Sequence, residues 1–224
     1  MGTIAYGEAL AWQRRVADRV RRGECIETLA LLDHPPVFTA GARGSFQNLL
    51  ADPREITLRG ADLVRVDRGG DITFHGPGQL VAYPIIDLHT HRMGARRYVY
   101  GLEAAIVATV GRFGVTAGRR AGYPGVWVDG AKVAAVGIRI SRGVTTHGVA
   151  INVTTELSWF DAIVPCGIPG VRVTSLERIL GRAPDLNRVA DAFAQDFAAA
   201  FNSRIIVSDG GLATREKELA LDGA

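Results

Sequence analysis

The residue with the clearest chemical potential in this 224-residue chain is Cys166. It lies in residues 164–170, a segment rich in proline and glycine. A structural cysteine prefers the apolar core, whereas a turn that continues into Gly167 presents the sulfur and leaves backbone N–H groups nearby. We therefore interpret Cys166 as a nucleophile and expect the amides after it to stabilise an oxyanion. Cys25 has no such setting, and we interpret it as an inert free thiol.

A second candidate is Lys132. Of the 26 basic residues only Lys132 and Lys217 are lysines, and Lys217 lies in a charged stretch where any cation would serve. Lys132 lies in the apolar run 131–136. Because arginine stays protonated in proteins and a partly buried lysine can lose its proton, Lys132 is a candidate proton shuttle. The alternative is a strand lysine whose head group reaches the surface.

The two residues suit one another chemically. An ammonium beside a thiol favours the thiolate, which is the reactive form, and a lysine can return a proton to a thiol leaving group. His75 and His147 are alternative partners for Cys166, because spacing along the chain does not reveal which base lies beside the sulfur.

Residues 68–79 form a glycine-rich segment. Five of these twelve residues are Gly or Pro, and glycine lets a backbone approach a ligand and expose its N–H groups. The spacing matches neither GxxxxGK[ST] nor GxGxxG, so neither nucleotide-binding motif is indicated. The alternative is a pair of tight turns beside a strand.

Hydrophobic periodicity predicts the elements that must position these residues. We expect helices at 6–22, 94–113 and 185–201, and a short helix opened by a capping box at 174–177. Asp129-Gly130 is a strong hairpin-turn signal. The expected strands are 28–33 with a resumption at 37–39, 62–66 and 71–75 around the Gly69-Gly70 turn, 80–88, 126–128, 132–140 and 144–153.

Strand alternation gives a prediction about faces. It places Lys132 on one face with Ala134, Val136 and Ile138. In the next strand Gly148, Ala150 and Asn152 share a face, and such small residues leave room for a ligand above the sheet.

Several features define the expected architecture. Residues 41–60 are typical of a surface loop, and Pro84 indicates an edge strand or a bulge. Helices at both ends with strands between them predict an α/β (α+β) fold with a mixed sheet and flanking helices. We expect one catalytic domain at 1–207 and a C-terminal tail at 208–224 that lacks a packing pattern and is partly disordered.

Composition narrows the class of protein. No apolar run is long enough for a transmembrane helix, and the N-terminus lacks a secretory signal, so we expect a cytoplasmic protein that does not bind membranes. The five histidines lack zinc-type spacing with the cysteines, although His89 and His91 alternate as a weak metal pair. The pI of about 9.1 admits a nucleic-acid binder, but recognition motifs and aromatic stacking platforms are missing from the sequence.

Together these segments resemble the lipoyl(octanoyl) transferases. The resemblance rests on four motifs that occur in order between residues 68 and 176: Arg68-Gly69-Gly70 with Thr73-Phe74-His75-Gly76-Pro77-Gly78-Gln79; Lys132 with Ala135-Val136-Gly137-Ile138-Arg139; His147-Gly148-Val149-Ala150-Ile151-Asn152; and Pro165-Cys166-Gly167-Ile168 with Thr174-Ser175-Leu176.

The resemblance implies a function and a site. It implies the fold of biotin and lipoate protein ligases, with Cys166 as nucleophile and Lys132 as its activating lysine. It implies acyl contacts at Arg68, Gly69, Gly70, Asp71, Ile72, Thr73, Phe74, His75, Ala135, Val136, Gly137, Gly148, Val149 and Ala150.

The resemblance also implies partners. An octanoyl group from acyl carrier protein, an acidic protein that arginines such as Arg68, Arg139 and Arg142 could steer, would pass through a Cys166 thioester to a lysine of a lipoyl domain. The acceptors would be 2-oxoacid dehydrogenase E2 subunits and the glycine cleavage H protein. We expect a monomer without metal, cofactor or ATP. The alternative is an ATP-dependent lipoate or biotin ligase of the same fold.

Overall fold

The computed structural model describes residues 2–42, 44, 46–208 and 215–221. Most strands belong to one large sheet, in which β10 is parallel to β8 and the other neighbours are antiparallel. In spatial order the strands are β11 (Ser203–Ser208), β12 (Arg215–Leu221), β1 (Glu27–Leu32), β5 (Gln79–Ile85), β9 (Val144–Asn152), β8 (Ala131–Ser141), β7 (Tyr123–Val128) and β6 (Gly118–Arg120), with β10 (Arg172–Val173) beside β8.

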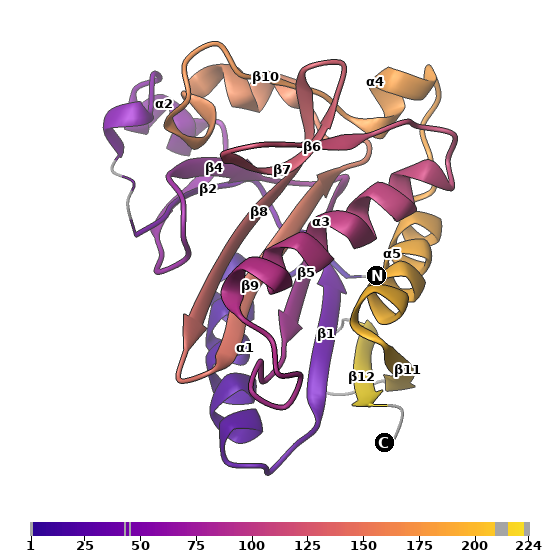
Figure 1. The fold of residues 1–224 in the computed structure, drawn as a ribbon. Helices are drawn as coiled ribbons and strands as arrows, with labels where there is room; N and C mark the ends of the chain where they lie inside the picture. Colours follow the sequence, from indigo (N-terminus) through magenta and orange to yellow (C-terminus); the bar gives the residue numbers. More distant parts are fainter. Residues whose placement is uncertain (1, 43, 45, 209–214, 222–224) are drawn as a thin grey trace.

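Helices cover both faces of this sheet (Figure 1). The helices α3 (Ala95–Gly111) and α5 (Leu186–Phe201) pack on one face, where Val189, Phe193 and Phe197 are fully buried. The helix α1 (Tyr6–Arg21) packs on the other face through Trp12 and Val16. The predicted mixed α/β fold with flanking helices is confirmed, and so is the short helix α4 (Leu176–Leu180), capped by Ser175. None of the described helices is long and apolar enough to cross a membrane.

A second, three-stranded sheet lies beside the large one. Its order is β3-β2-β4, with β2 at Val37–Ala40, β3 at Asp62–Arg65 and β4 at Ile72–His75. The strands β3 and β4 were expected around a Gly69-Gly70 turn, but both pair with β2 and neither pairs with the other. The glycines therefore form a loop that crosses toward β8, where Gly69 N–H donates to Ile138 O over 2.8 Å.

The expected surface loop at 41–60 was partly wrong. It contains a 3-10 turn, η1 (Phe46–Asn48), and a helix, α2 (Pro53–Leu58). The Asp52 carboxylate caps α2 by accepting from Arg54 N–H, and proline stands in its first turn, a helix-start signal. Ile56 is fully buried against the aromatic cluster that supports β4.

The strand β8 contains a bulge that changes the face of Lys132. In the pairing of β7 with β8, Trp127 lies opposite Lys132 and the preceding Val126 lies opposite Ala134, so Val133 is an extra residue. Both Val133 and Ala134 are consequently buried in the core beneath α3 and α5. The prediction that Lys132 shares a face with Ala134 is therefore wrong, and the bulge turns Lys132 toward the opposite side.

Pro84 lies in an inner strand, because β5 is flanked by β1 and β9. The expected edge position is wrong, although the pairing of β5 with β9 does end at Ala82–Val149, just before the proline. Side chains replace the backbone hydrogen bonds between β5 and β9 that are missing here. Thr145 Oγ1 donates to Pro84 O over 2.7 Å, and His147 N–H donates to Gln13 Oε1 over 2.7 Å. His147 has a left-handed φ of 58° at this irregularity.

The expected tail also differs from the structure. Residues Arg215–Leu221 form β12, which pairs with β1 on one side and with β11 on the other. The large sheet thus includes residues beyond the expected domain end at 207. The expectation of disorder falls partly on residues 209–214 and 222–224, which lie outside the described residues.

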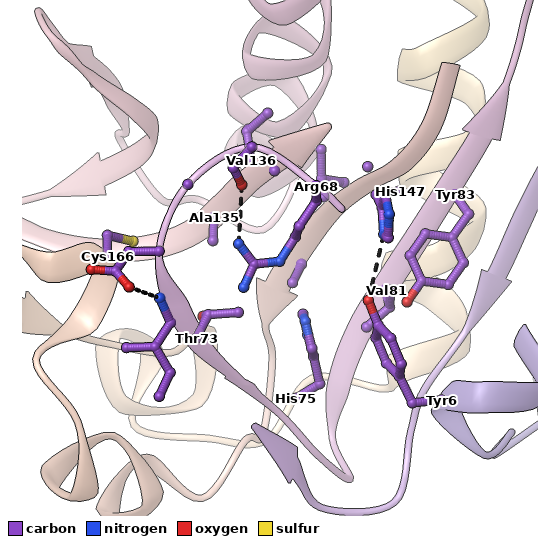
Figure 2. A pocket seen from close by; sticks show the side chains of 18 residues that line it. Tyr6, Arg68, Thr73, His75, Val81, Tyr83, Ala135, Val136, His147 and Cys166 are labelled. Carbon is purple, nitrogen blue, oxygen red and sulfur yellow. Dashed lines mark hydrogen bonds between the residues drawn. The ribbon is translucent and has the colours of Figure 1, made fainter. Parts of the chain in front are cut away.

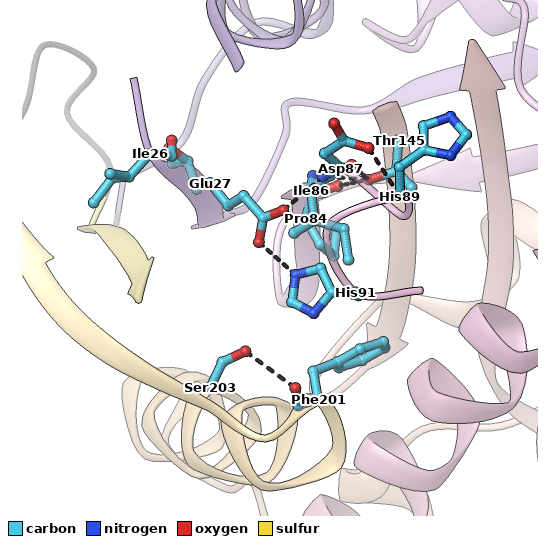
Figure 3. A network of polar contacts seen from close by, with 11 residues as sticks. Ile26, Glu27, Pro84, Ile86, Asp87, His89, His91, Thr145, Phe201 and Ser203 are labelled. Atoms are coloured by element: carbon cyan, nitrogen blue, oxygen red, sulfur yellow. Dashed lines mark hydrogen bonds and ion pairs between the residues drawn. The ribbon is translucent and has the colours of Figure 1, made fainter. Parts of the chain in front are cut away.

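The two alternating histidines point to different partners (Figure 3). His91 Nε2 contacts Glu27 Oε2 at 2.6 Å, and Glu27 Oε1 also accepts from Asp87 N–H. His89 instead lies against Gly143 in the turn between β8 and β9. The pair ties the 86–94 loop to β1 and to the turn between β8 and β9. In the described part of the chain, no group of three or more His, Cys, Asp or Glu residues could hold a metal ion.

The close approach of β9 to β5 gives a stability prediction. A Cβ added at Gly148 would overlap Ala82 O and lie 2.7 Å from Pro84 Cδ. Gly148→Ala should therefore lower the free energy of unfolding in urea by more than about 2 kcal/mol. The matched control is Gly111→Ala, where a Cβ meets nothing within 4 Å and a helical position gains from alanine. Equal stability of the two variants would contradict this account of β9.

Candidate active site

Cys166 is held in a strained turn. It lies in η3 (Pro165–Gly167) with φ 57° and ψ 17°, a left-handed conformation that non-glycine residues rarely adopt. Gly167 follows with φ 67°, and a Cβ there would overlap the Asp71 carboxylate. Asp71 is fixed by hydrogen bonds from Asn48 Nδ2 and Ile72 N–H. The turn is thus clamped against the loop that precedes β4, as the Pro/Gly setting predicted.

Lys132 reaches this turn from the bulge in β8. Its Nζ lies 3.3 Å from Cys166 Sγ and 5.1 Å from the centre of the Trp127 ring. The side chain is only 5% exposed. Gly125 on β7 makes room for it, since a Cβ at that position would lie 2.9 Å from Lys132 Cε. The sequence indicated a thiol in a turn at Cys166 and an amine that can lose its proton at Lys132, and the fold brings these two groups into contact.

Burial constrains the charge state of this pair. An isolated ammonium is costly to remove from water unless an anion or an acceptor accompanies it. Among the contacts of the described residues, Cys166 Sγ is the polar partner of Lys132 Nζ, and no carboxylate pairs with the amine. Moving one proton from sulfur to nitrogen leaves the net charge of the pair unchanged.

A narrow cavity of about 50 Å³ begins at Cys166. In Figure 2, Cys166 lies at one end of this cavity, Tyr6, Tyr83 and His147 lie at the other, and Arg68 stands between them. The acyl-contact residues expected from the sequence that line it are Arg68, Gly69, Gly70, Asp71, Ile72, Thr73, His75, Ala135, Val136, Gly137, Gly148, Val149 and Ala150.

Phe74 is the expected contact residue that does not line the cavity. Its side chain is 1% exposed and packs with Phe38, Trp159 and Phe160 behind β4. Thr73 and His75 point to the cavity side of the same strand, as alternation requires. Phe74 thus supports the wall from outside.

Arg68 places a positive charge in the cavity wall. Its guanidinium is buried and donates through Nη1 to Gly69 O (3.0 Å) and through Nη2 to Thr39 O (2.6 Å) and Thr39 Oγ1 (2.8 Å). Burial lowers the pKa of Arg68. Carbonyl and hydroxyl acceptors solvate the guanidinium, and a Cβ at Gly137 would lie only 3.1 Å from Arg68 Cδ. Gly137 therefore makes room for this side chain.

The side chains of Tyr6, His75 and Tyr83, which line the far end of the cavity, are polar and uncharged. Burial lowers the pKa of His75 to about 3, assisted by the nearby His34 and Arg68, and burial lowers the pKa of His34 to about 4. Burial also raises the pKa of Tyr6 to about 12. The hydroxyl of Tyr83 and the carbonyl of Ile4 satisfy the ring nitrogens of His34 at 2.7 and 2.6 Å.

His147 belongs to a second polar chain at this end. Its Nε2 lies 2.8 Å from Asp67 Oδ1, and its Nδ1 lies 3.4 Å from the Tyr6 hydroxyl. Burial lowers the pKa of His147. Burial opposes ionisation of Asp67, but hydrogen bonding to His147 and the charge of Arg139 hold the pKa of Asp67 below its ordinary value. Asp67 thus anchors His147 at the back of the cavity.

A hydrogen-bonded chain links the glycine-rich segment to the strands around Lys132. His75 Nδ1 lies 2.7 Å from Gln79 Oε1, and Gln79 Nε2 donates to Asn152 Oδ1 over 2.8 Å. Asn152 Nδ2 then donates to Thr174 O, whose own N–H donates to Lys132 O. The segment therefore positions the reactive pair and does not merely form turns.

These contacts bear on two alternatives that the sequence left open. Lys132 is in hydrogen-bond reach of the sulfur, while His75 and His147 make their hydrogen bonds to Thr39, Gln79, Tyr6 and Asp67. The expected oxyanion donors are engaged as well: Gly167 N–H donates to Val164 O and Ile168 N–H donates to Pro165 O. These two amides stabilise the turn and point to its own carbonyls.

Comparison with known proteins places the chain in a family. The model of the lipoyl protein ligase A/B catalytic domain matches residues 5–198. The chain belongs to this family. Within it, the chain is 45% identical to the octanoyltransferase of Chloroflexus aggregans over 207 residues, 91% of this chain and 94% of that protein. It is 46% identical to an octanoyltransferase of Chloroflexus aurantiacus over 204 residues, 90% and 92% of the two chains. The resemblance to lipoyl(octanoyl) transferases is confirmed.

Solved structures of lipoate protein ligases share the fold of this chain. A bipartite lipoate protein ligase from Thermoplasma acidophilum has a TM-score of 0.67 at 17% identity and covers 88% of this chain and 80% of its own. Lipoate-protein ligase A bound with ATP has a TM-score of 0.64 at 15% identity, with 84% and 79% covered. At such low identity the likeness establishes the fold alone.

Sequence reasoning missed the far end of the cavity. Tyr6, Val81 and Tyr83 line it together with residues of the family motifs. Tyr6 begins α1 and Tyr83 lies in an inner strand, where an aromatic residue is ordinary core. No local pattern distinguishes them, because they meet only when α1 packs across β5 and β9.

The neutral buried histidines predict acid sensitivity. His34 and His75 have folded-state pKa values of about 4 and 3, below the ordinary value of 6.5. Below pH 6.5 these histidines are therefore protonated in the unfolded chain while they stay neutral in the folded chain. The free energy of unfolding should therefore decrease as the pH is lowered from 6.5 toward 4, by about 1.4 kcal/mol per pH unit for each histidine. Urea unfolding between pH 7.5 and 5 measures this, and His75→Gln should reduce the slope by the share of one histidine, about 1.4 kcal/mol per pH unit. A constant unfolding free energy would contradict it.

Proposed function

We propose that the chain transfers an octanoyl group from acyl carrier protein to a lysine of a lipoyl domain, through a thioester on Cys166. The observation that carries this proposal is the 3.3 Å contact between Lys132 Nζ and Cys166 Sγ at the entrance of the cavity. A nucleophile paired with a base and an adjoining apolar slot are what acyl transfer through a covalent intermediate requires. The curated relatives named octanoyltransferase support the identity of the acyl group.

The first step loads the enzyme. The Cys166 thiolate attacks the carbonyl carbon of the donor thioester, and the bond from that carbon to the donor sulfur breaks. The Lys132 ammonium gives its proton to the departing donor thiolate. The products are a free donor thiol, an octanoyl thioester on Cys166 and a neutral Lys132 amine. Exchange of one thioester for another is nearly balanced, so a good nucleophile suffices.

The second step transfers the octanoyl group from Cys166 to the acceptor lysine. Neutral Lys132 takes one proton from the ammonium of the acceptor lysine, and the resulting amine attacks the Cys166 thioester. The C–S bond breaks, an amide forms, and the second amine proton passes to solvent. The thiolate and the ammonium of the original pair are restored. An amide is more stable than a thioester, which draws the cycle forward.

The cavity walls suit an alkyl chain. Ala135 and Ala150 lie opposite one another on β8 and β9 and, with Val136 and Val149, contribute small or branched apolar surface beyond Cys166. The uncharged state of His75 and Tyr6 avoids placing further charges along the path of the chain. The acceptors we propose are lipoyl domains of 2-oxoacid dehydrogenase E2 subunits and the glycine cleavage H protein, with the enzyme a cytoplasmic monomer.

Intact-mass analysis tests the covalent step. Incubation with octanoyl-acyl carrier protein should add one octanoyl group to the chain without ATP, and Cys166→Ala should abolish the adduct because no acceptor sulfur remains. Cys25→Ala is the matched control and should be acylated like the wild type. An ATP-dependent ligase of the same fold needs no cysteine, so lipoyl-domain modification by Cys166→Ala that requires ATP would replace our proposal.

A pair of Lys132 variants tests the proton relay. Lys132→Arg retains a positive charge that cannot be passed on, and Lys132→Met retains the apolar stem without charge. We expect single-turnover loading and overall turnover to fall by at least about 100-fold in both variants. Thermal melting checks that each variant is folded. Near-normal turnover of Lys132→Arg would make the lysine purely electrostatic and leave His75 as the base.

A further inference from the structure

A groove leads from the reactive pair across the surface to a cluster of arginines. The hollow at the mouth of the site contains Lys132 and Cys166 and is bordered by Val99, Gly122, Tyr123 and Pro124. A neighbouring hollow is bordered by the same four residues and extends to Arg96, Arg119 and Arg120. The two hollows therefore adjoin one another along these residues of the N-terminal part of α3 and the β6–β7 hairpin.

Aromatic rings hold these arginines in place. The Arg96 and Arg119 guanidinium groups lie 5.3 and 4.9 Å from the centre of the Tyr100 ring. The Arg120 guanidinium lies 4.6 Å from the Tyr123 ring and 5.2 Å from the Trp127 ring. Trp127 also contacts Lys132 Nζ, so one ring adjoins both the outer arginine and the reactive lysine.

Within the described residues these three arginines form no ion pair with a carboxylate. The acidic residues that border the groove are already engaged. Glu103 is 4% exposed and accepts from Gly125 N–H, and Asp71 accepts from Asn48 and from Ile72 N–H. The outer groove therefore carries uncompensated positive charge on ordered, exposed side chains.

The two proposed partners differ in what they could lay along such a groove. The acceptor offers a short lysine side chain with a positive head group, which arginines would repel. The donor offers its acyl group on a long, thin pantetheine arm joined to the carrier protein through a phosphodiester. A narrow path with the nucleophile at one end and arginines at the other matches that arm in shape and charge.

We propose that Arg119 and Arg120, with Arg96 beside them, bind the phosphate that joins the pantetheine arm to the donor protein, while the arm lies in the groove toward Cys166. This inference rests on the proposed acyl transfer and names the surface that selects its donor. The three arginines border the outer hollow and not the one that contains Lys132 and Cys166, so the role we propose for them is donor binding alone.

The test compares Cys166 loading by three donors: octanoyl-acyl carrier protein, octanoyl-4′-phosphopantetheine and octanoyl-pantetheine. Arg119→Gln/Arg120→Gln should lower kcat/KM for the two phosphate-bearing donors by about tenfold and for octanoyl-pantetheine by less than twofold. The control Arg182→Gln/Arg188→Gln removes the same charge from exposed positions in and near α5 and should match the wild type with every donor. Transfer from preloaded Cys166 to a lipoyl domain should be unchanged.

Each other outcome overturns the inference. Loss with the carrier protein only would mean that the arginines bind its acidic side chains and not the phosphate. Equal loss with all three donors would indicate damage to the site, and loss confined to the transfer step would assign the groove to the acceptor. If wild-type protein is loaded by none of the donors, the proposed function itself fails; if it is loaded and the arginine variants behave like it, this inference alone fails.

Discussion

The site depends on burying one amine beside one sulfur. Lys132 can lie in a nearly closed position because Cys166 Sγ is 3.3 Å away and can share its proton. That requirement explains features in three separate segments: a bulge at Val133 that turns the lysine, a glycine at 125 that admits its stem, and a left-handed cysteine clamped by Asp71. Each of these would be unfavourable in an ordinary sheet, and together they serve a single contact.

The cavity beyond the pair combines apolar surface from β8 and β9 with polar residues from the glycine-rich segment. Burial keeps His75 neutral, and its ring is hydrogen-bonded to Gln79. Arg68 is the exception, because it retains its charge among carbonyl and hydroxyl acceptors. The segment therefore acts as scaffold and wall at once, since the same residues also reach Asn152 and the backbone of Lys132.

The sequence drew attention to Cys166 and Lys132, which the structure places in contact, but it predicted less of their surroundings. Cys166 was conspicuous by its turn and Lys132 by the scarcity of lysine, and most helices and strands followed from periodicity. The bulge at Val133 could not be predicted from β8 alone, because it exists only in the pairing with β7. Tyr6 and Tyr83 could not be assigned to the cavity because they come from an N-terminal helix and an inner strand that meet through packing. The helix α2, by contrast, has a start signal in the sequence, because Asp52 caps it and Pro53 opens it.

The position of β12 has a consequence for how the chain acquires its shape. In the part of the chain that the structure describes, β1 pairs with β5 on one side and with β12 on the other. During synthesis β1 emerges early and β12 late, so the β12 side of β1 stays open while Lys132 and Cys166 are already available to fold. An open, apolar inner strand is a template for pairing with another nascent chain. The large sheet is thus completed by a long-range pairing of β1 with β12. Until that pairing forms, we expect the chain to be exposed to aggregation even though most of the sheet can already be assembled.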